Sequence, residues 1–335
     1  MTRIPLTGGE ALDVAAKLAP ALAAGAGERD RTRRLPHTEI DELSASGLLA
    51  VTVPAEFGGP ELGPGVVAGI LSILAAADPS VAQIPHSHFV FLDALRRNGS
   101  VELQRSIFKQ VIDGARIANA QTERRSRTVA EDAATVRTAD DDGTLRLDGV
   151  KYYCTGSVFA HLLAVRAVDA TATREDASGT ARSVVVYLPA DRPGITVTDD
   201  WDGLGQRTTA SGTVTFDDVH VEPGEIVDYT ALFDGPGTYG ARAQLFHAAI
   251  DAGIARGALE AGADAAANAR PWTEAGVDRA VDDPLLIVQA GELELTVRAA
   301  EALLERAAAA IDAAERVTTD DAAGAPAAIA EASLA

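Results

Sequence analysis

The sequence predicts an α+β fold in three parts: an N-terminal helical domain over residues 1–113, a β-barrel domain over 114–228 and a C-terminal helical bundle over 229–335. Apolar residues recur at helical spacing in the first and last parts. In the middle part, short segments rich in Val, Ile, Thr and Tyr are separated by turn residues. The chain has 335 residues, of which 47% are hydrophobic and 23% charged, an ordinary composition for a globular protein of two or three domains.

The first part is expected to form helices at residues 9–24, 37–47, 65–77, 87–97 and 100–112. Pro20 predicts a break or kink in the first of them, because proline removes a hydrogen bond from a helix interior. Thr38 has the side chain of an N-cap residue for the second helix. The third segment is nearly all apolar and is expected to be buried. Asn98-Gly99 marks a helix end before the last segment.

The middle part is expected to form an antiparallel sheet or barrel, with strands at residues 115–121, 134–138, 144–147, 181–188, 195–198 and 212–221. Turns between them are indicated by Asp141-Asp142-Gly143, by Asp148-Gly149 and by residues 191–194. Residues 171–180 have the composition of a mobile loop.

The last part is expected to start with a long helix over residues 238–268. Asp283 and Pro284 have the residue types of an N-cap and a first helical position. The helix that they open is expected to run to about Val317, with an apolar stripe typical of bundle packing. After a linker at 318–324, a last segment starts near Pro326, and the chain is expected to end inside a helix.

Charge and cysteine content narrow the function classes. The formal net charge of −20 repels phosphate backbones and anionic lipid, so neither nucleic-acid binding nor a membrane-surface role is expected. Cys154 is the only cysteine, which excludes an intrachain disulfide and a thiolate zinc site. The first 20 residues lack the pattern of a signal peptide, and the longest apolar run, about residues 66–77, is too short to span a bilayer. A cytoplasmic protein is therefore expected.

The common catalytic and nucleotide-binding motifs do not occur. No GxGxxG follows a strand, and neither a P-loop, an HExxH nor a GxSxG is present. His86 and His88 form an HxH pair, but no nearby carboxylate cluster completes a metal site, so no metal is predicted.

Three segments in the expected order carry a family resemblance. They are Ala118-Asn119-Ala120-Gln121-Thr122-Glu123; Gly149-Val150-Lys151-Tyr152-Tyr153-Cys154-Thr155-Gly156-Ser157; and residues 203–213 with the following strand at 214–221. They resemble the motifs A-x-T-E, G-x-K-x-W-I-T-N, M-G-x-R-x-S-x-T and F-D-D-V-x-V-P in the flavin-binding domain of the acyl-CoA dehydrogenase superfamily. Residues 86–91, 200–203, 246–251 and 269–272 look like the sulfur-acquisition branch, which includes the dibenzothiophene desulfurisation monooxygenases.

This resemblance implies a reaction and its partners. Members of that branch take reduced FMN from a separate flavin reductase, bind oxygen and oxidise a small organosulfur compound, usually as homotetramers. The alternatives are an FAD-dependent acyl-CoA dehydrogenase and a catalytically silent scaffold or fragment. A dehydrogenase needs a carboxylate base, and residues 237–250, where some members carry it, contain no Asp or Glu. The other known location lies in C-terminal helices that the family has beyond this chain, so the bundle is expected to be incomplete.

The resemblance also implies cofactor-binding residues. Thr155 falls where the family's threonine bonds flavin N5, and Tyr153 replaces the tryptophan beside the ring. Gln121, Thr122 and Glu123 would face the pyrimidine end, with Cys154 and Gly156 in the same loop as Thr155. Arg270 resembles an arginine that contacts the cofactor phosphate. The structural alternatives are an ordinary strand threonine for Thr155, a core aromatic for Tyr153 and a solvated arginine for Arg270.

Catalytic roles are expected for His88, Asn119, Thr155 and Ser157 around the position where reduced flavin and oxygen react. His88 would donate a proton or a hydrogen bond, since histidine titrates near neutral pH. Its replacement by alanine is then expected to abolish oxygenation and spare flavin binding. The alternative is a histidine that packs on a helix face, and the same alternative applies to His247 in the bundle.

Overall fold

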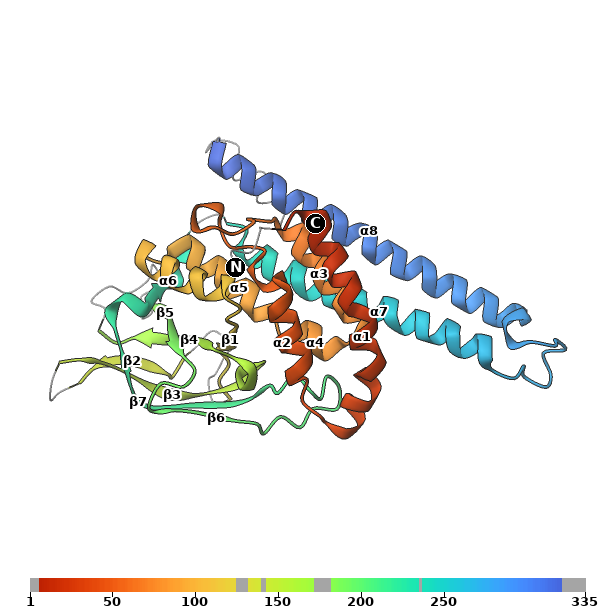
Figure 1. Cartoon of the computed structure of the whole chain (residues 1–335), viewed down its shortest axis with the longest axis horizontal. Coiled ribbons are helices and arrows are strands. Elements are labelled where there is room, and N and C mark those ends of the chain that lie inside the picture. The colour runs from red at the N-terminus through yellow and green to blue at the C-terminus, as the bar shows by residue number, and fades with distance from the viewer. Residues whose placement is uncertain (1–5, 125–131, 140–142, 172–181, 235–236, 321–335) are drawn as a thin grey trace.

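The computed structural model describes residues 6–124, 132–139, 143–171, 182–234 and 237–320. One mixed sheet lies on one side of the molecule, the N-terminal helices lie beside it, and two long helices run along the opposite side and project beyond the rest (Figure 1). The order of helices, sheet and helices confirms the predicted α+β fold class.

The N-terminal helices are α1 (Gly8–Thr32), α2 (His37–Ser46), α3 (Pro64–Ala77), α4 (Pro79–Gln83), α5 (His86–Asn98) and α6 (Val101–Ile112). The break expected at Pro20 does not occur, because helix α1 continues through it. The N-cap expected at Thr38 was also wrong, because Pro36 is the residue before α2.

The second half of α1 is held by Arg29, which is almost fully buried. Its guanidinium donates to Asp78 at 2.7 Å, to Glu39 at 2.8 Å and to the Leu22 carbonyl. These charge-assisted contacts stabilise the part of the helix that follows Pro20.

The sheet contains β1 (Ile117–Ala120), β2 (Thr135–Thr138), β3 (Leu145–Cys154), β4 (Leu162–Asp169), β5 (Ser183–Pro189), β6 (Ile195–Thr198), β7 (Gly212–Val221) and β8 (Ile226–Asp228). The strand order is β6-β7-β3-β2-β4-β5-β8, with β1 on β4. Strands β1 and β2 both run parallel to β4, so the sheet is mixed rather than wholly antiparallel. Directly after β1, Thr122 pairs with Tyr152 of β3, so β1 connects β4 back to β3.

Strand β3 is longer than expected because Asp148-Gly149 forms a bulge rather than a turn. Gly149 has φ 154°, and a Cβ there would lie 2.4 Å from the Cβ of Ala134, so only glycine fits. The bulge lets β3 run on to Cys154, which carries the residues after it to the edge of the helical domain. Strands β4 and β8 were not anticipated, and the loop expected at 171–180 lies almost wholly outside the described residues.

The bundle part consists of α7 (Tyr239–Asn268) and α8 (Pro284–Asp320). Asp283 accepts from the Leu285 amide at 2.9 Å, the capping contact of an N-cap. Arg242 of α7 is buried and binds both carboxylate oxygens of Glu315 of α8, at 2.9 and 3.0 Å. The segment expected near Pro326 lies outside the described residues, and within them no helix is long and apolar enough to cross a membrane.

Helix α5 is buried on all sides from His86 to Leu95, although several of its residues are polar. His88 shows how such a side chain is accommodated. It is 1% exposed; its Nε2 donates to the Leu49 carbonyl at 2.8 Å, and its Nδ1 accepts from the Ile117 amide at 3.1 Å. Burial lowers its pKa to about 4, so the ring is neutral.

These contacts contradict the expectation that His88 donates a proton in catalysis. Both ring nitrogens are occupied by backbone groups, and a proton donor needs one that is free to reach the reacting atoms. His88 instead connects the helical domain, through Leu49, to the first strand of the sheet.

His88→Ala is therefore expected to lower the free energy of unfolding by about 3–5 kcal/mol, since it leaves a cavity and two buried backbone groups without partners. Urea denaturation measures this loss. The control is His220→Ala, because the His220 side chain is partly exposed and its ring bonds the exposed Glu222; its expected change is below about 0.5 kcal/mol. Equal stability of the two variants would contradict the structural role.

The stability of the protein is expected to fall as the pH drops from 6.5 towards 4. Burial holds the pKa of His86 and of His88 at about 4 in the folded chain, against 6.5 as the ordinary value. The unfolded chain binds more protons in this window, so each histidine removes up to about 1.4 kcal/mol of stability per pH unit. Urea midpoints between pH 7 and pH 4.5 test the slope, which is expected to be smaller in His88→Ala.

Candidate functional site

The segment after β3 has a strained backbone. Tyr153 has φ 57°, in the left-handed region that aromatic residues rarely occupy, and Gly156 has φ 77°. The facing segment contains two further non-glycine residues of this kind, Gln206 with φ 46° and Ala210 with φ 47°. The two segments are joined where the Gly156 amide donates to the Thr209 carbonyl at 3.0 Å. Such strain concentrates at functional sites, where the surrounding structure holds it.

Three hydroxyl groups connect the same two segments. Thr155 Oγ1 lies 2.8 Å from Ser211 Oγ, and Ser211 Oγ lies 2.8 Å from Thr209 Oγ1. Thr209 Oγ1 donates in turn to the Gln206 carbonyl at 3.1 Å. Thr155 is half-buried, whereas Ser211 and Thr209 are buried, so Thr155 is the outer member of the three. Thr155 is therefore not an ordinary strand threonine, and Ser211 and Thr209 are residues that sequence reasoning missed.

Ser157 and Gly156 bring this segment against the start of α5. A Cβ on Gly156 would lie 3.1 Å from the Ile84 side chain, so the two backbones pack closely. Ser157 is 2% exposed, and its hydroxyl has no hydrogen-bond partner among the described residues. A buried hydroxyl without a partner is unusual in a folded protein.

Asn119 meets the first turn of α5. Its Oδ1 accepts from the Ser87 hydroxyl at 3.0 Å, and both residues are buried. The neighbouring His86 contacts α7 instead, where its ring lies against the ring of His247 at a centroid distance of 3.7 Å. The start of α5 thus brings β1 and α7 together. Ser87 and His86 are candidates that the sequence did not single out for catalysis, whereas His247 was already one.

His86 and His247 differ in their surroundings. His86 is buried, and its Nε2 donates to the Ala243 carbonyl at 3.2 Å. Burial, with a smaller contribution from His247, lowers the pKa of His86 to about 4. His247 is exposed at its outer side, and burial of the rest lowers its pKa against the opposing effect of Asp251. His247 is therefore the member of the pair that can exchange protons with solvent.

Lys151 holds the segment that contains Gln121 and Glu123. Its side chain is fully buried, and its ammonium donates to the Gln121 carbonyl at 3.0 Å, to Glu123 at 2.6 Å and to Asp132 at 2.9 Å. Asp132 also accepts from Arg166 at 2.7 Å. The ion pairs fix the backbone between Gln121 and Glu123 against β3.

The Glu123 side chain is committed to this structural role. Besides Lys151, its oxygens accept from the amides of Ala133 and Ala134 at 2.8 and 2.9 Å. Burial alone would raise the pKa of Glu123. The hydrogen bonds to Lys151 and to the two amides have the larger combined effect, so the pKa lies below its ordinary value. A direct contact from this carboxylate to a flavin, as expected from sequence, does not fit its three partners. Thr122 pairs with Tyr152, whose amide donates to the Thr122 carbonyl at 2.8 Å.

Tyr153 presents an aromatic face at this edge. It is 46% exposed, and its ring makes an edge contact with Trp201, at a centroid distance of 6.2 Å. Trp201 is held by a bond from its Nε1 to the Gln206 carbonyl at 3.0 Å. Arg124 lies over the rings of Tyr152 and Tyr153, at 4.4 and 5.4 Å from their centroids. Tyr153 is thus not the core aromatic of the alternative interpretation.

Cys154 and Arg270 are not brought into this arrangement. The Cys154 side chain is buried in the core of the sheet, and burial raises the pKa of its thiol to about 12. This contradicts a side-chain contact with a cofactor. Arg270 is exposed and follows the end of α7, at the far end of the projecting helices (Figure 1). One copy of the chain therefore does not place Arg270 beside Thr155.

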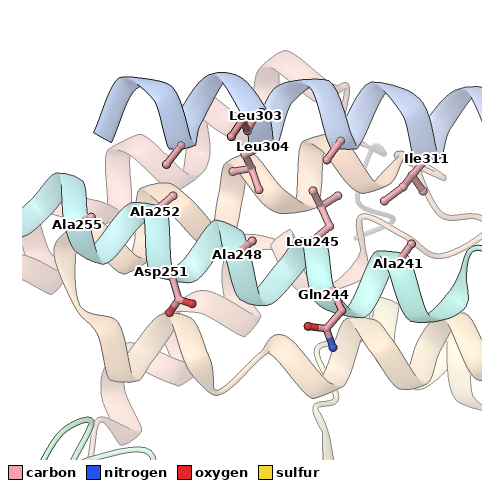
Figure 2. Close-up of a pocket in the computed structure, with 12 residues that line it drawn as sticks. Ala241, Gln244, Leu245, Ala248, Asp251, Ala252, Ala255, Leu303, Leu304 and Ile311 are labelled. Atoms are coloured by element: carbon pink, nitrogen blue, oxygen red, sulfur yellow. The ribbon is translucent and has the colours of Figure 1, made fainter. Parts of the chain in front are cut away.

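A groove of about 660 Å³ lies elsewhere, between α7 and α8 (Figure 2). Its lining is largely alanine and leucine, and its polar residues Gln244 and Asp251 point away from α8. The groove lacks the converging polar groups of the site around Thr155 and has the character of a packing surface.

Family models of the acyl-CoA dehydrogenases match the chain in three consecutive parts. The N-terminal domain matches residues 12–115, the middle domain residues 118–219 and the C-terminal domain residues 245–335. The middle domain spans β1 to β7 and therefore contains the Thr155 and Ser211 segments.

Individual proteins are similar over most of the chain. Dibenzothiophene monooxygenase of Rhodococcus qingshengii is 32% identical over 304 residues, covering 88% of this chain and 72% of the relative. The probable FMNH₂-dependent monooxygenase SfnC of Pseudomonas putida is 30% identical, covering 91% of this chain and 74% of the relative. The crystal structure of FMN-bound TdsC from Paenibacillus sp. A11-2 superimposes with a TM-score of 0.82 at 32% identity, covering 90% of this chain and 76% of that one. The chain therefore belongs to the acyl-CoA dehydrogenase superfamily, with dibenzothiophene monooxygenase among its relatives.

Proposed function

We propose that this protein is the oxygenase of a two-component system. It takes reduced FMN from a separate flavin reductase and uses oxygen to oxidise a small organosulfur compound. The observation that carries this proposal is the similarity to dibenzothiophene monooxygenase over 88% of the chain. The names of two further relatives, one FMNH₂-dependent and one solved with FMN, support FMN rather than FAD.

The residues of the site fit a flavin. Thr155 offers a half-buried hydroxyl, Ser157 a buried hydroxyl without a partner among the described residues, and Tyr153 an exposed aromatic face. The backbone of Gln121 and Thr122, held by Lys151, lies on the adjoining strand segment. Thr155 and these backbone groups would hold the polar edge of the ring system, with Tyr153 beside it. Arg270 would contribute to phosphate binding only from a second copy of the chain.

When bound, reduced FMN supplies the electrons that activate oxygen. Asn119 and Ser87 would orient the substrate or the reacting oxygen, since their mutual hydrogen bond fixes the amide on β1. His247 would hold or move a proton, with His86 as its buried partner. The close packing of Gly156 on Ile84 excludes water from one side, which protects a reactive site from side reactions.

The first three turns of α7 offer no carboxylate base for the competing dehydrogenase reaction. Helix α7 contains no carboxylate from Tyr239 to Ile250; its first is Asp251. An acyl-CoA dehydrogenase needs a carboxylate to remove a proton from carbon. This observation favours oxygenation.

Purified protein is expected to bind FMNH₂ and, when mixed with NADH, a flavin reductase and air, to oxidise an organosulfur test compound such as dibenzothiophene. Mass spectrometry with ¹⁸O₂ should find the label in the product, and omission of the reductase should abolish it. Tight FAD binding with bleaching by an acyl-CoA would replace this function by dehydrogenation. Failure to bind any flavin would indicate a silent scaffold.

Lys151→Met is expected to weaken FMN binding by roughly tenfold to a hundredfold, because the segment of Gln121 and Glu123 loses its anchor. Stability should also fall, since the change leaves buried carboxylates short of a partner. The control is Arg192→Met, which breaks the Arg192–Glu225 ion pair in the same domain, away from this segment. Fluorescence titration with FMN, at a temperature where both variants are folded, should find weakened binding only for Lys151→Met. Equal affinities would contradict the positioning role.

We also infer that the protein forms a homotetramer and acts in the cytoplasm, where a reductase can supply reduced flavin. The projecting helix α8 leaves large apolar side chains exposed, namely Leu285, Ile287, Val288, Leu293, Leu295 and Leu303. An exposed apolar surface of this extent favours association with a partner surface.

The double variant Leu285→Glu/Leu295→Glu is expected to shift the protein from tetramers to smaller species in light scattering after gel filtration, with helix content by circular dichroism unchanged. Val101→Glu, a matched change of an exposed apolar residue on α6, should leave the mass unchanged. A wild-type mass equal to one chain would refute the inferred assembly.

A further inference from the structure

The chain of hydroxyls that ends at Thr155 has a fixed direction. Each serine or threonine hydroxyl carries one proton to donate and two lone pairs to accept with. At the far end, the Gln206 carbonyl has no proton, so Thr209 must donate to it. Thr209 then has no proton left for Ser211, and Ser211 must donate to Thr209. By the same argument Thr155 donates to Ser211.

The end of the chain is firmly anchored. The Gln206 carbonyl also accepts from Trp201 Nε1 at 3.0 Å and from the Thr209 amide at 3.3 Å. Gln206 adopts a positive φ of 46°, which holds its carbonyl in this position against the local preference of the backbone. Thr209 and Ser211 are buried, so water does not compete for their hydroxyls. The direction of the chain is therefore set by the protein.

The outer hydroxyl, that of Thr155, consequently faces a bound molecule as an acceptor. Its proton is committed to Ser211, so towards any further group the hydroxyl can only accept, through its two lone pairs. Flavin N5 changes between hydrogen-bond acceptor and hydrogen-bond donor with the redox state of the flavin. Oxidised flavin has an unprotonated N5, which accepts a hydrogen bond, whereas reduced flavin has an N5–H, which donates one.

We propose that the Thr155–Ser211–Thr209 chain makes the site selective for reduced over oxidised FMN. The proposal rests on the function inferred above and on the contact between Thr155 and N5 that the family resemblance implies. The N5–H of reduced FMN can donate a hydrogen bond to the Thr155 oxygen. N5 of oxidised FMN and the Thr155 oxygen are both acceptors, so no hydrogen bond forms between them. Ser211 and Thr209 act as positioning residues, through Thr155. The selectivity would let the protein take reduced flavin from a reductase and release the oxidised product.

The test measures dissociation constants of wild-type protein for FMN in air and for FMNH₂ under anaerobic conditions. The wild type is expected to bind FMNH₂ at least about tenfold more tightly than oxidised FMN. This is the expected effect of one hydrogen bond that forms with FMNH₂ and is missing with oxidised FMN. In Ser211→Ala the proton of Thr155 is free to turn towards N5, so this preference should fall about tenfold. For a two-electron couple, a tenfold change corresponds to about 30 mV in the midpoint potential of bound FMN, which provides a second readout.

Thr209→Val should lower the preference in the same direction, because Ser211 is then free to donate to Thr155. The control is Thr213→Val, two residues along β7 from Ser211, which removes a hydrogen bond to Asp200 outside the chain of hydroxyls. A general disturbance of the site weakens both forms of FMN and leaves their ratio unchanged, whereas loss of the directed chain changes the ratio.

Three outcomes separate this inference from the function on which it rests. A preference for FMNH₂ that falls in Ser211→Ala and Thr209→Val but not in Thr213→Val supports it. Equal affinity of the wild type for the two forms, or a ratio that neither variant changes, overturns it and leaves the proposed monooxygenase standing. Failure of the wild type to bind either form overturns both.

Discussion

The polar side chains of helix α5 must all find partners, because the helix is buried from His86 to Leu95. The partners come from every part of the fold. His86 donates to α7, Ser87 to Asn119 of β1, and His88 joins Leu49 to Ile117. Near the other end of the helix, Asp93 pairs with Arg97 at 2.8 Å and lies 3.6 Å from Arg242 of α7. The helix therefore fixes how the sheet and the long helices sit relative to one another, and its first turn becomes the place where the polar site forms.

The site combines strained backbone with rigid support. Tyr153, Gln206 and Ala210 occupy the left-handed region, each at a cost of about 1–3 kcal/mol. The support comes from nearby residues. Lys151 anchors the segment of Glu123 by buried ion pairs, and the Gly156 amide joins the segment after β3 to the segment of Thr209. A ring system that must be held between loops benefits from such preorganised groups, because less ordering remains to be done on binding.

The sequence was sufficient where local pattern decides the structure. Helix α3 follows from its apolar run, α8 from Asp283 and Pro284, and β7 from its alternation. It was insufficient where distant contacts decide: Arg29 stabilises α1 past Pro20, and a close approach to Ala134 turns Gly149 into a bulge. In the candidate site, the motifs pointed to Thr155 and Asn119, whose roles stay predictions. They could not show that His88 is enclosed by backbone groups, that His86 stacks on His247, or that Ser211 orients Thr155, since these pairs join residues far apart in the chain.

The burial of Cys154 makes the chain convenient for site-specific chemistry. With a thiol pKa of about 12 and no exposure, the only native cysteine is inert towards maleimides at neutral pH. An introduced cysteine is then the single point of labelling, without prior removal of native thiols. Leu204 is fully exposed and next to Gly203, which packs against the Trp201 ring, so a dye at Leu204→Cys would lie close to the aromatic edge of the site. Such a label would follow the arrival of a flavin in real time by energy transfer.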